Sequence, residues 1–155
     1  MEKYLGVKLI EAEQKTHGEY TKIKYCESNP INTEFSKENV NSAGYMVKYD
    51  NNYISWSPKD VFEKAYFKLE KTNNTICQTD VDLFIKDVKS IKQGEKTTVT
   101  TVTLINGFEI FEASSCVDPD NFDMSLGEQI CLGKIKDKIW NLLGFLLQTG
   151  VAGIK

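Results

Sequence analysis

Apolar and polar residues alternate in three places within the first sixty residues of the chain. Residues 4–13 alternate imperfectly around Leu5, Val7 and Leu9, which predicts an opening strand with one buried face. Residues 44–49 and 53–56 are rich in aromatic side chains and flank a pair of asparagines, a combination typical of a β-hairpin. Residues 16–42 are polar, so we expect a long loop there with at most one short helical turn.

A helix is predicted directly after this hairpin. Ser57 is expected to cap the helix, Pro58 to occupy its first position, and Asp60 to complete a capping box near the positive end of the helix dipole. Apolar residues then recur on one helical face: Val61, Phe62, Ala65, Tyr66 and Leu69. The first half is therefore predicted to be a strand, hairpin and helix module that covers residues 1–74.

The polar segment at residues 72–75 is the best candidate for a linker, and a second module is expected over residues 75–155. Its expected elements are a short helix from residue 79, strands at 89–93, 97–105 and 108–113, and a long helix at 122–148. The Asn106-Gly107 pair is the strongest hairpin signal in the chain. The predicted fold class is α+β, with two small modules that each pack antiparallel strands with helix.

The long helix carries apolar residues at helical spacing. Its expected inner residues are Leu126, Ile130, Ile135, Ile139, Leu142 and Leu146. Three glycines also occur within it, and glycine is unfavourable inside a helix. We therefore expect either a break in the helix or a close packing contact at one of them, above all at Gly144. The residues after position 148 are expected to fray.

Composition restricts the kinds of partner. The 155 residues carry a formal net charge of −3, and every one of the 19 basic side chains is lysine. Binding to bulk duplex DNA is therefore not expected, and any anion site must use lysine, hydroxyl or backbone N–H groups in place of arginine. We also expect no membrane segment, no metal, no cofactor and reduced cysteines, and we expect the protein to be intracellular.

The sequence contains no motif of the common phosphate-binding, dinucleotide-binding, hydrolase or zinc-protease sites, so an enzyme is not expected. His17 is predicted to lie on a surface loop. Cys116 leaves open another functional class, a cysteine-dependent enzyme, in which its thiol would face the N-terminus of the last helix. Asp118, Asp120 and Asp123 do not match a calcium loop and are expected to cap helices.

The aromatic hairpin is the main candidate for a binding site, because its rings can stack on a base while nearby lysines meet a phosphate. The candidate ligand-binding residues are Tyr45, Lys48, Tyr49, Tyr53, Trp56 and Lys59. The alternative is that half of these rings form the core against Phe62 and Tyr66. A row of hydroxyls at residues 97–103 is expected on a solvated strand face.

Several segments of the second half also resemble a known family in their order and spacing. These segments are residues 99–111, residues 114–123, Gly127 and residues 138–147. Over about residues 79–148 the chain resembles the small phage-protein family named after gene forty-nine of coliphage N-four and gene sixty-six of a Shigella phage. Leu143 and Phe145 stand where that family tends to have an acid and a tyrosine. Residues 4–13 and 44–66 look like an accessory module at the front of several small phage proteins.

The resemblance implies a phage or prophage accessory protein and supplies no catalytic residues. Small acidic phage proteins without enzyme motifs are often anti-defence factors that act by binding. The leading hypothesis is a protein that sequesters a nucleotide-derived immune signal at the aromatic hairpin. The alternative is a protein-binding inhibitor of a host or bacterial defence enzyme, similar to an anti-CRISPR protein. In either case a homo-oligomer is expected, because two small modules bury little core by themselves.

Overall fold

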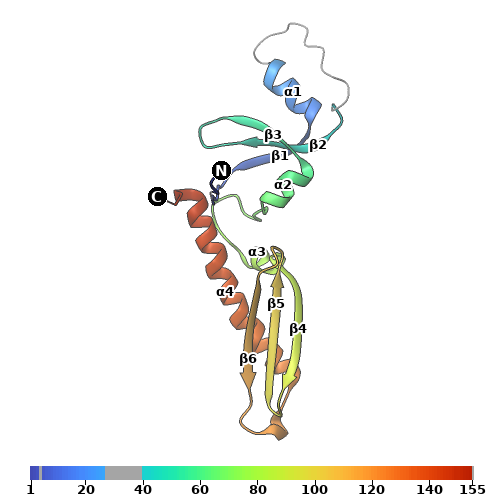
Figure 1. Cartoon of the computed structure of the whole chain (residues 1–155), viewed down its shortest axis with the longest axis vertical. Coiled ribbons are helices and arrows are strands. Elements are labelled where there is room, and N and C mark those ends of the chain that lie inside the picture. Colours follow the sequence, from blue (N-terminus) through green and yellow to red (C-terminus); the bar gives the residue numbers. More distant parts are fainter. Residues whose placement is uncertain (4, 27–39, 155) are drawn as a thin grey trace. The chain divides into compact units, whose positions relative to one another are not determined.

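The structure, a computed structural model, describes residues 1–3, 5–26 and 40–154 and has the α+β fold that the sequence predicts (Figure 1). The described chain forms two compact units, one made of Lys8–Lys68 and the other of Met1–Val7 with Leu69–Lys155. We call them the hairpin unit and the C-terminal unit. The division after Lys68 lies a few residues before the expected boundary at residue 74.

The hairpin unit contains a three-stranded antiparallel sheet between two helices. Its strands are β1 (Glu11–Thr16), β2 (Ala43–Lys48) and β3 (Ile54–Pro58), in the order β1-β2-β3. The helices α1 (His17–Cys26) and α2 (Lys59–Ala65) lie on opposite sides of this sheet (Figure 1). Because successive strand residues point to opposite faces, the hairpin sends its aromatic rings toward both helices.

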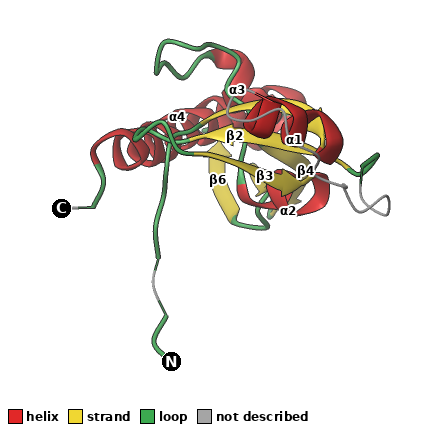
Figure 2. Cartoon of the chain, turned by 90° about the horizontal axis from the view of Figure 1, so that it is seen from above, coloured by secondary structure: helices red, strands yellow, loops and turns green. Residues whose placement is uncertain are grey.

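The beginning of this unit differs from the prediction. The opening strand starts only at Glu11, and the chain before it is drawn as a loop in Figure 2. The ten residues of α1 occupy part of the segment that was predicted to be a loop, whereas residues 27–39 of that segment lie outside the described residues. The prediction was wrong because, among residues 17–25 of α1, Tyr20 and Thr21 alone are buried, too few apolar positions to give a helical period.

A local signal for α1 is nevertheless present. The backbone N–H of Thr16 donates to Glu19 Oε2 at 2.7 Å, and the N–H of Glu19 donates to Thr16 Oγ1 at 3.3 Å. These two bonds form a capping box, which satisfies backbone donors that the first turn of a helix leaves free. The backbone hydrogen bond from Thr16 also lowers the pKa of Glu19.

The start of α2 corrects a second prediction. Strand β3 continues to Pro58, which is itself the N-cap residue and makes no side-chain capping bond. Ser57 is paired with Tyr45 in the sheet, so it does not cap the helix. The helix ends at Ala65, and Phe62 is the buried residue of the predicted apolar face, whereas Val61 is 55% exposed.

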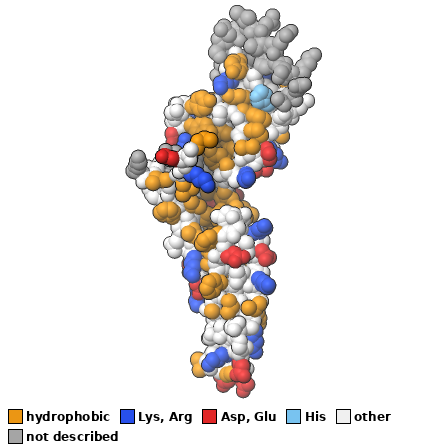
Figure 3. Space-filling model, in the orientation of Figure 1, with side chains coloured by type: hydrophobic (Ala, Val, Ile, Leu, Met, Phe, Trp, Pro, Cys, Tyr) orange, Lys and Arg blue, Asp and Glu red, His pale blue; other side chains and the backbone are white. Residues whose placement is uncertain are grey.

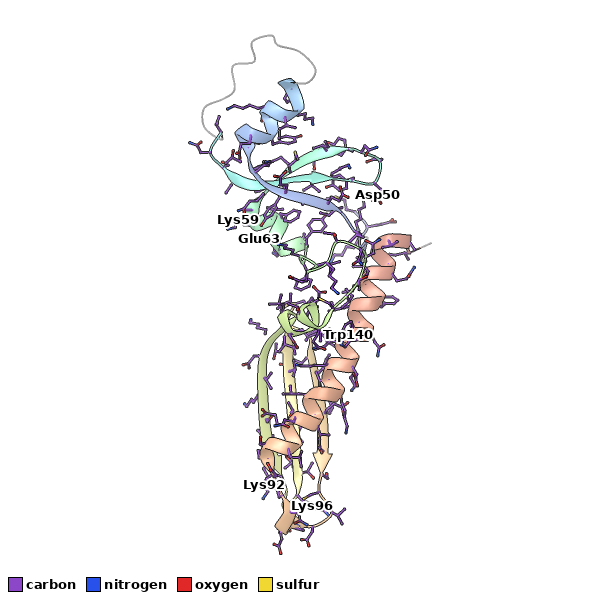
Figure 4. All side chains as sticks on the ribbon, turned by 180° about the vertical axis from the view of Figure 1, so that it is seen from behind. Asp50, Lys59, Glu63, Lys92, Lys96 and Trp140 are labelled. Atoms are coloured by element: carbon purple, nitrogen blue, oxygen red, sulfur yellow. The ribbon has the colours of Figure 1, made fainter. Side chains whose placement is uncertain are left out.

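The C-terminal unit contains a second antiparallel sheet with one long helix packed on it (Figure 4). Its elements are α3 (Gln78–Leu83), β4 (Ile85–Gln93), β5 (Thr97–Leu104), β6 (Glu109–Ser115), the 3-10 turn η1 (Pro119–Asn121) and α4 (Met124–Ala152). The strand order is β4-β5-β6. The predicted Asn106-Gly107 hairpin is confirmed, because Gly107 has a φ of 83° and Asn106 Oδ1 accepts from the N–H of Phe108.

The buried face of α4 is only partly the predicted one. Ile135 and Ile139 are buried as expected, and the other buried residues are Gly127, Cys131 and Leu143. The remaining predicted inner residues, Leu126, Ile130, Leu142 and Leu146, are between 39% and 55% exposed. The buried residues recur every four positions along α4. The first two of them are a glycine and a cysteine, which are small, so the pattern of large apolar residues predicted a neighbouring face of the helix.

The glycines of α4 also act differently from the prediction. The helix continues without a break through Gly144 and ends at Ala152, so the last turn does not fray at residue 149 as expected. The close packing contact occurs instead at Gly127, where an added Cβ would stand 2.2 Å from Thr98 Oγ1. Gly127 therefore allows the first turns of α4 to approach β5.

The hydroxyl row on β5 is divided between the two faces of the sheet. Thr98 and Thr100 are buried on the face that α4 covers, which corrects the prediction of a solvated row. Thr100 Oγ1 lies 2.8 Å from Ser90 Oγ, so this buried hydroxyl has a hydrogen-bond partner. Thr101 and Thr103 are half-buried on the other face.

The predicted capping role of the aspartates is confirmed for Asp118 and Asp123. Asp118 accepts from the N–H of Asp120 at the start of η1. Asp123 Oδ1 accepts from the N–H groups of Ser125 and Leu126 at 2.8 and 3.0 Å. It therefore satisfies two backbone donors in the first turn of α4.

Replacing Asp123 with alanine is expected to lower the free energy of unfolding by about 1 kcal/mol, because both donors lose their acceptor. Urea unfolding followed by far-UV circular dichroism measures the change. Asp120→Ala is the matched control, since Asp120 uses its backbone N–H and not its side chain in the turn. An equal loss of stability in both variants would contradict the capping role.

Candidate functional site

Aromatic rings and lysines come together at the turn of the β2–β3 hairpin and on α1. The group consists of Lys8, Tyr20, Lys24, Tyr49 and Tyr53, and we call it the Tyr53 cluster. The Tyr53 side chain is 56% exposed, and its ring centroid lies 5.9 Å from that of Tyr49. The Lys24 ammonium lies 5.7 Å from the Tyr53 centroid and 5.4 Å from the Tyr20 centroid. These distances are typical of cation–π contacts.

The hairpin turn fixes the two tyrosines of the cluster. The N–H of Tyr49 donates to the carbonyl of Tyr53 at 2.9 Å, and the N–H of Asn52 donates to the carbonyl of Tyr49 at 2.8 Å. Asn52 has a φ of 61°, the left-handed conformation that the sequence predicted for the asparagine pair. Tyr49 and Tyr53 therefore face each other across the turn.

The position of Lys24 is set by α1. Its ammonium donates to the Tyr20 hydroxyl at 2.8 Å, from a residue one helical turn later. This hydrogen bond raises the pKa of Lys24, so the side chain is a cation at neutral pH. A second ammonium, that of Lys8, lies 5.7 Å from the Tyr49 centroid. The cluster thus joins exposed aromatic surface with positive charge.

Two of the predicted site residues, Tyr45 and Lys59, make their contacts with side chains of α2. The Tyr45 ring stacks on Phe62 with centroids 4.1 Å apart, and Phe62 stacks on Tyr66 at 4.8 Å. The Tyr45 hydroxyl donates to Glu63 Oε1 at 2.9 Å, and this hydrogen bond raises the pKa of Tyr45. Lys59 lies 3.9 Å from the same carboxylate (Figure 4). Tyr45 is therefore part of the core with Phe62, as the alternative prediction stated.

Trp56 packs under α1. Its indole N–H donates to the carbonyl of Lys15 at 3.0 Å. The rings of Trp56 and His17 pack edge to face, with their centroids 4.8 Å apart. Gly44 makes room for the indole, because a Cβ there would stand 2.4 Å from the ring. His17 is half-buried at the start of α1, which corrects its prediction as a surface loop residue. The remaining candidate, Lys48, is ion-paired with Glu11 at 3.5 Å.

The structure therefore brings Tyr49 and Tyr53 together, while Tyr45 and Lys59 contact Glu63 of α2. Tyr49 also shares a hydrogen bond with Tyr66, the ring that stacks on Phe62. Binding of a ligand by the six candidate residues stays a prediction. Lys24 and Lys8 were not among the binding residues predicted from the sequence. Lys24 lies in the segment that was predicted to be a loop, and Lys8 lies in the segment that was predicted to be a strand. The capping box that begins at Thr16 is the signal that would have placed Lys24 on a helix.

The Cys116 thiol, a possible metal site and a membrane-spanning helix are further features relevant to function. The Cys116 thiol donates to the carbonyl of Asp118 at 3.0 Å, a contact that holds the turn before α4. Within residues 1–3, 5–26 and 40–154, no three histidine, cysteine, aspartate or glutamate side chains gather in a way that could hold a metal ion. No helix in those same ranges has the length and apolar character needed to span a membrane.

These observations define a two-unit α+β protein with an exposed aromatic and lysine cluster. The chain belongs to the Phage protein (N4 Gp49/phage Sf6 gene 66) family, whose model matches residues 59–151 and thus more than half of the sequence. The match begins in α2 and extends from there through α3, the strands β4 to β6 and all of α4 except its last residue, which confirms the resemblance seen in the sequence. No curated protein and no solved structure matches the chain.

Proposed function

We propose that this phage accessory protein binds and sequesters a nucleotide-type immune signal and that the Tyr53 cluster holds this ligand. The observation that carries the proposal is the exposed Tyr53 ring with the Lys24 ammonium 5.7 Å from its centroid. An exposed ring stacks on a nucleobase, and a nearby cation attracts a phosphate. The proposed action is binding without catalysis, in the host cytoplasm.

The chemistry of the cluster suits a ligand that carries both a base and phosphate. Tyr53 exposes more than half of its surface, so a planar group can reach it without displacing the core. Lys24 is held by the Tyr20 hydroxyl and therefore loses less conformational freedom on binding than an unrestrained lysine. Lysine acts as a point charge, so recognition of phosphate here does not require the paired geometry of arginine.

The first test is a thermal shift of the full chain against cyclic dinucleotides, cyclic trinucleotides and ADP-ribose derivatives. A ligand that binds only the folded protein is expected to stabilise it by about 2.7 kcal/mol at a hundredfold excess over Kd. Tyr53→Leu is expected to raise Kd about tenfold or more, because one stacked base contributes about 1–3 kcal/mol. Lys24→Gln is expected to weaken binding and to reduce its dependence on salt.

Tyr45→Phe is the matched control, since it removes a hydroxyl that donates to Glu63 and makes no contact with the Tyr53 cluster. Isothermal titration calorimetry on the three variants gives their Kd values. The proposal fails if no compound shifts the melting temperature. It also fails if Tyr53→Leu and Tyr45→Phe bind a ligand equally well. A complex with a host or defence enzyme in place of any small ligand would favour the inhibitor alternative.

A further inference from the structure

One edge of the C-terminal sheet directs backbone groups outward, and no strand of the described chain pairs with it. The N–H of Leu104 donates to the carbonyl of Phe108, and the N–H of Cys116 donates to the carbonyl of Lys96. In an antiparallel pair, hydrogen-bonded and non-bonded positions alternate, so the even-numbered residues of β6 face β5. The N–H and C=O groups of Glu109, Phe111 and Ala113 consequently point away from the sheet. Those of Ala113 contact side chains of the same chain, since its C=O accepts from Lys134 and its N–H bonds the Glu112 carboxylate, and pairing with another strand would replace these contacts.

A groove runs beside this edge, with a volume of about 630 Å3. It is lined by residues 108–113 and by Lys138, Asn141 and Leu142 of α4. Two lysines of α4 reach β6 there: Lys134 donates to the carbonyl of Ala113 at 3.3 Å, and Lys138 is ion-paired with Glu112. The groove therefore combines an unpaired strand edge with a mixed apolar and charged wall.

We propose that this edge pairs with the same edge of a second copy of this chain, with the two β6 strands antiparallel about a twofold axis at Phe111. In this register Phe111 lies opposite Phe111 of the second copy, and Glu109 lies opposite Ala113. Each of these pairs exchanges both of its hydrogen bonds, because all three residues direct their backbone groups outward. The two sheets become one continuous antiparallel sheet, a closed and self-complementary interface.

The side chains at the axis match themselves under this symmetry. Figure 3 shows hydrophobic side chains exposed on the sheet face that α4 leaves open. Phe111 is 70% exposed on this face, and a second Phe111 directly opposite would cover it. On the other face, Glu112 and Lys138 of each copy bring together two carboxylates and two ammonium groups, so their charges balance. A like-charged wall would instead oppose pairing.

The position of α4 fits a second copy as well. This helix packs on both β5 and β6, so its axis lies over the boundary between them. With strands about 4.8 Å apart, the twofold axis places the two α4 helices about 10 Å apart, the spacing of packed helices. Leu142, which lines the groove and is 39% exposed, lies on the side of α4 that faces the second copy.

The opposite edge of the sheet lacks these properties. Thr100 of β5 directs its backbone N–H and C=O toward β6. Ser90, which lies opposite Thr100 on β4, forms no hydrogen-bonded pair with it and therefore directs its own backbone groups away from the sheet. The outward positions of β4 therefore include Lys92, and lysines on an edge strand are a common protection against pairing with another strand. The register of β4 is irregular between Ile85 and Asp87, another feature that protects an edge strand. We therefore place the interface at β6 and not at β4.

The test is the molar mass of the full chain by size-exclusion chromatography with light scattering, under reducing conditions. The unchanged protein is expected at twice 17.6 kDa. Ala113→Pro removes an outward N–H without touching a bond to β5, which edge strands tolerate. It is expected to raise the dimer Kd about a hundredfold, because the symmetry removes the bond at both ends. Ala113→Val keeps the N–H and is expected to stay dimeric.

A second variant keeps the test valid if proline disturbs the strand. Phe111→Lys retains every backbone group but places two like charges opposite each other at the axis, so it is also expected to yield 17.6 kDa. The proposal is overturned if the unchanged protein is a monomer at all concentrations. It is equally overturned if both folded variants remain dimeric, or if the groove is instead occupied by a different protein that copurifies with a monomer.

Discussion

Replacing Asp80 with alanine is expected to lower the free energy of unfolding by about 3 kcal/mol. Asp80 is fully buried, and its two carboxylate oxygens accept from different backbone segments. Oδ1 accepts from the N–H of Glu70 at 2.8 Å, and Oδ2 accepts from the N–H of Cys77 at 2.7 Å. Without the carboxylate, both donors lose a charged acceptor in a buried site, which makes this one of the two largest effects that we expect.

The stability that Asp80 provides should depend on pH. Burial by itself raises the pKa of Asp80, but the backbone hydrogen bonds from Glu70 and Cys77 outweigh it, so the pKa lies below its usual value. A carboxyl whose pKa is lower in the folded state stabilises the fold above its unfolded pKa of about 3.9. That contribution is lost as the pH falls through the lower, folded pKa.

Urea unfolding of the wild type, of Asp80→Ala and of Asp80→Asn between pH 7 and pH 2 tests both points. The difference in stability should be greatest at neutral pH and should shrink as the pH falls below about 4. Asp82→Ala is the control, because Asp82 is an exposed neighbour that pairs with Lys136 at 2.8 Å. Its replacement should cost at most about 1 kcal/mol. A pH-independent difference for Asp80→Asn would contradict the proposed role of its charge.

Replacing Gly127 with alanine is expected to lower the free energy of unfolding by about 2 kcal/mol, although alanine is the better helix former. The new Cβ would stand 2.2 Å from Thr98 Oγ1 and 2.7 Å from Thr98 Cβ. Thr98 is buried on a central strand and its branched side chain is stiff, so it cannot move aside at low cost. Either β5 or α4 has to shift.

The same helix supplies the control. Gly133 and Gly144 are exposed, and an added Cβ would meet nothing within 4 Å at either position. Gly133→Ala and Gly144→Ala are therefore expected to raise stability by up to about 1 kcal/mol each. Thermal unfolding followed at 222 nm compares the three variants. If Gly127→Ala were as stable as the other two, the close approach of α4 to β5 would be wrong.

The sequence was most informative where local chemistry acts by itself. The Asn106-Gly107 turn, the hairpin with the Asn51-Asn52 pair and the Asp123 cap were all predicted and are all present. Each depends on the conformation or hydrogen bonding of a few adjacent residues, and such preferences persist whatever the rest of the chain does. The family, too, could be identified from residues of the C-terminal unit.

Prediction was weaker where burial decides the structure. α1 was missed because few of its residues are buried, and the capping box at Thr16 and Glu19 was overlooked. The inner face of α4 was displaced because Gly127 and Cys131 are small and do not stand out in an apolar pattern. The pattern of side-chain types indicates which residues are hydrophobic, but it does not indicate which tertiary neighbour packs closely against a small residue.

The candidate site shows the same division. The sequence by itself determined that aromatic rings and lysines are concentrated in the hairpin, that any anion site must do without arginine, and that the class is α+β. Only the tertiary structure decided that Tyr45 stacks in the core, that Trp56 packs beneath α1, and that Tyr53 meets Lys24. The reason is physical: alternation along a strand fixes opposite faces, but which face is covered depends on helices that pack from elsewhere in the chain.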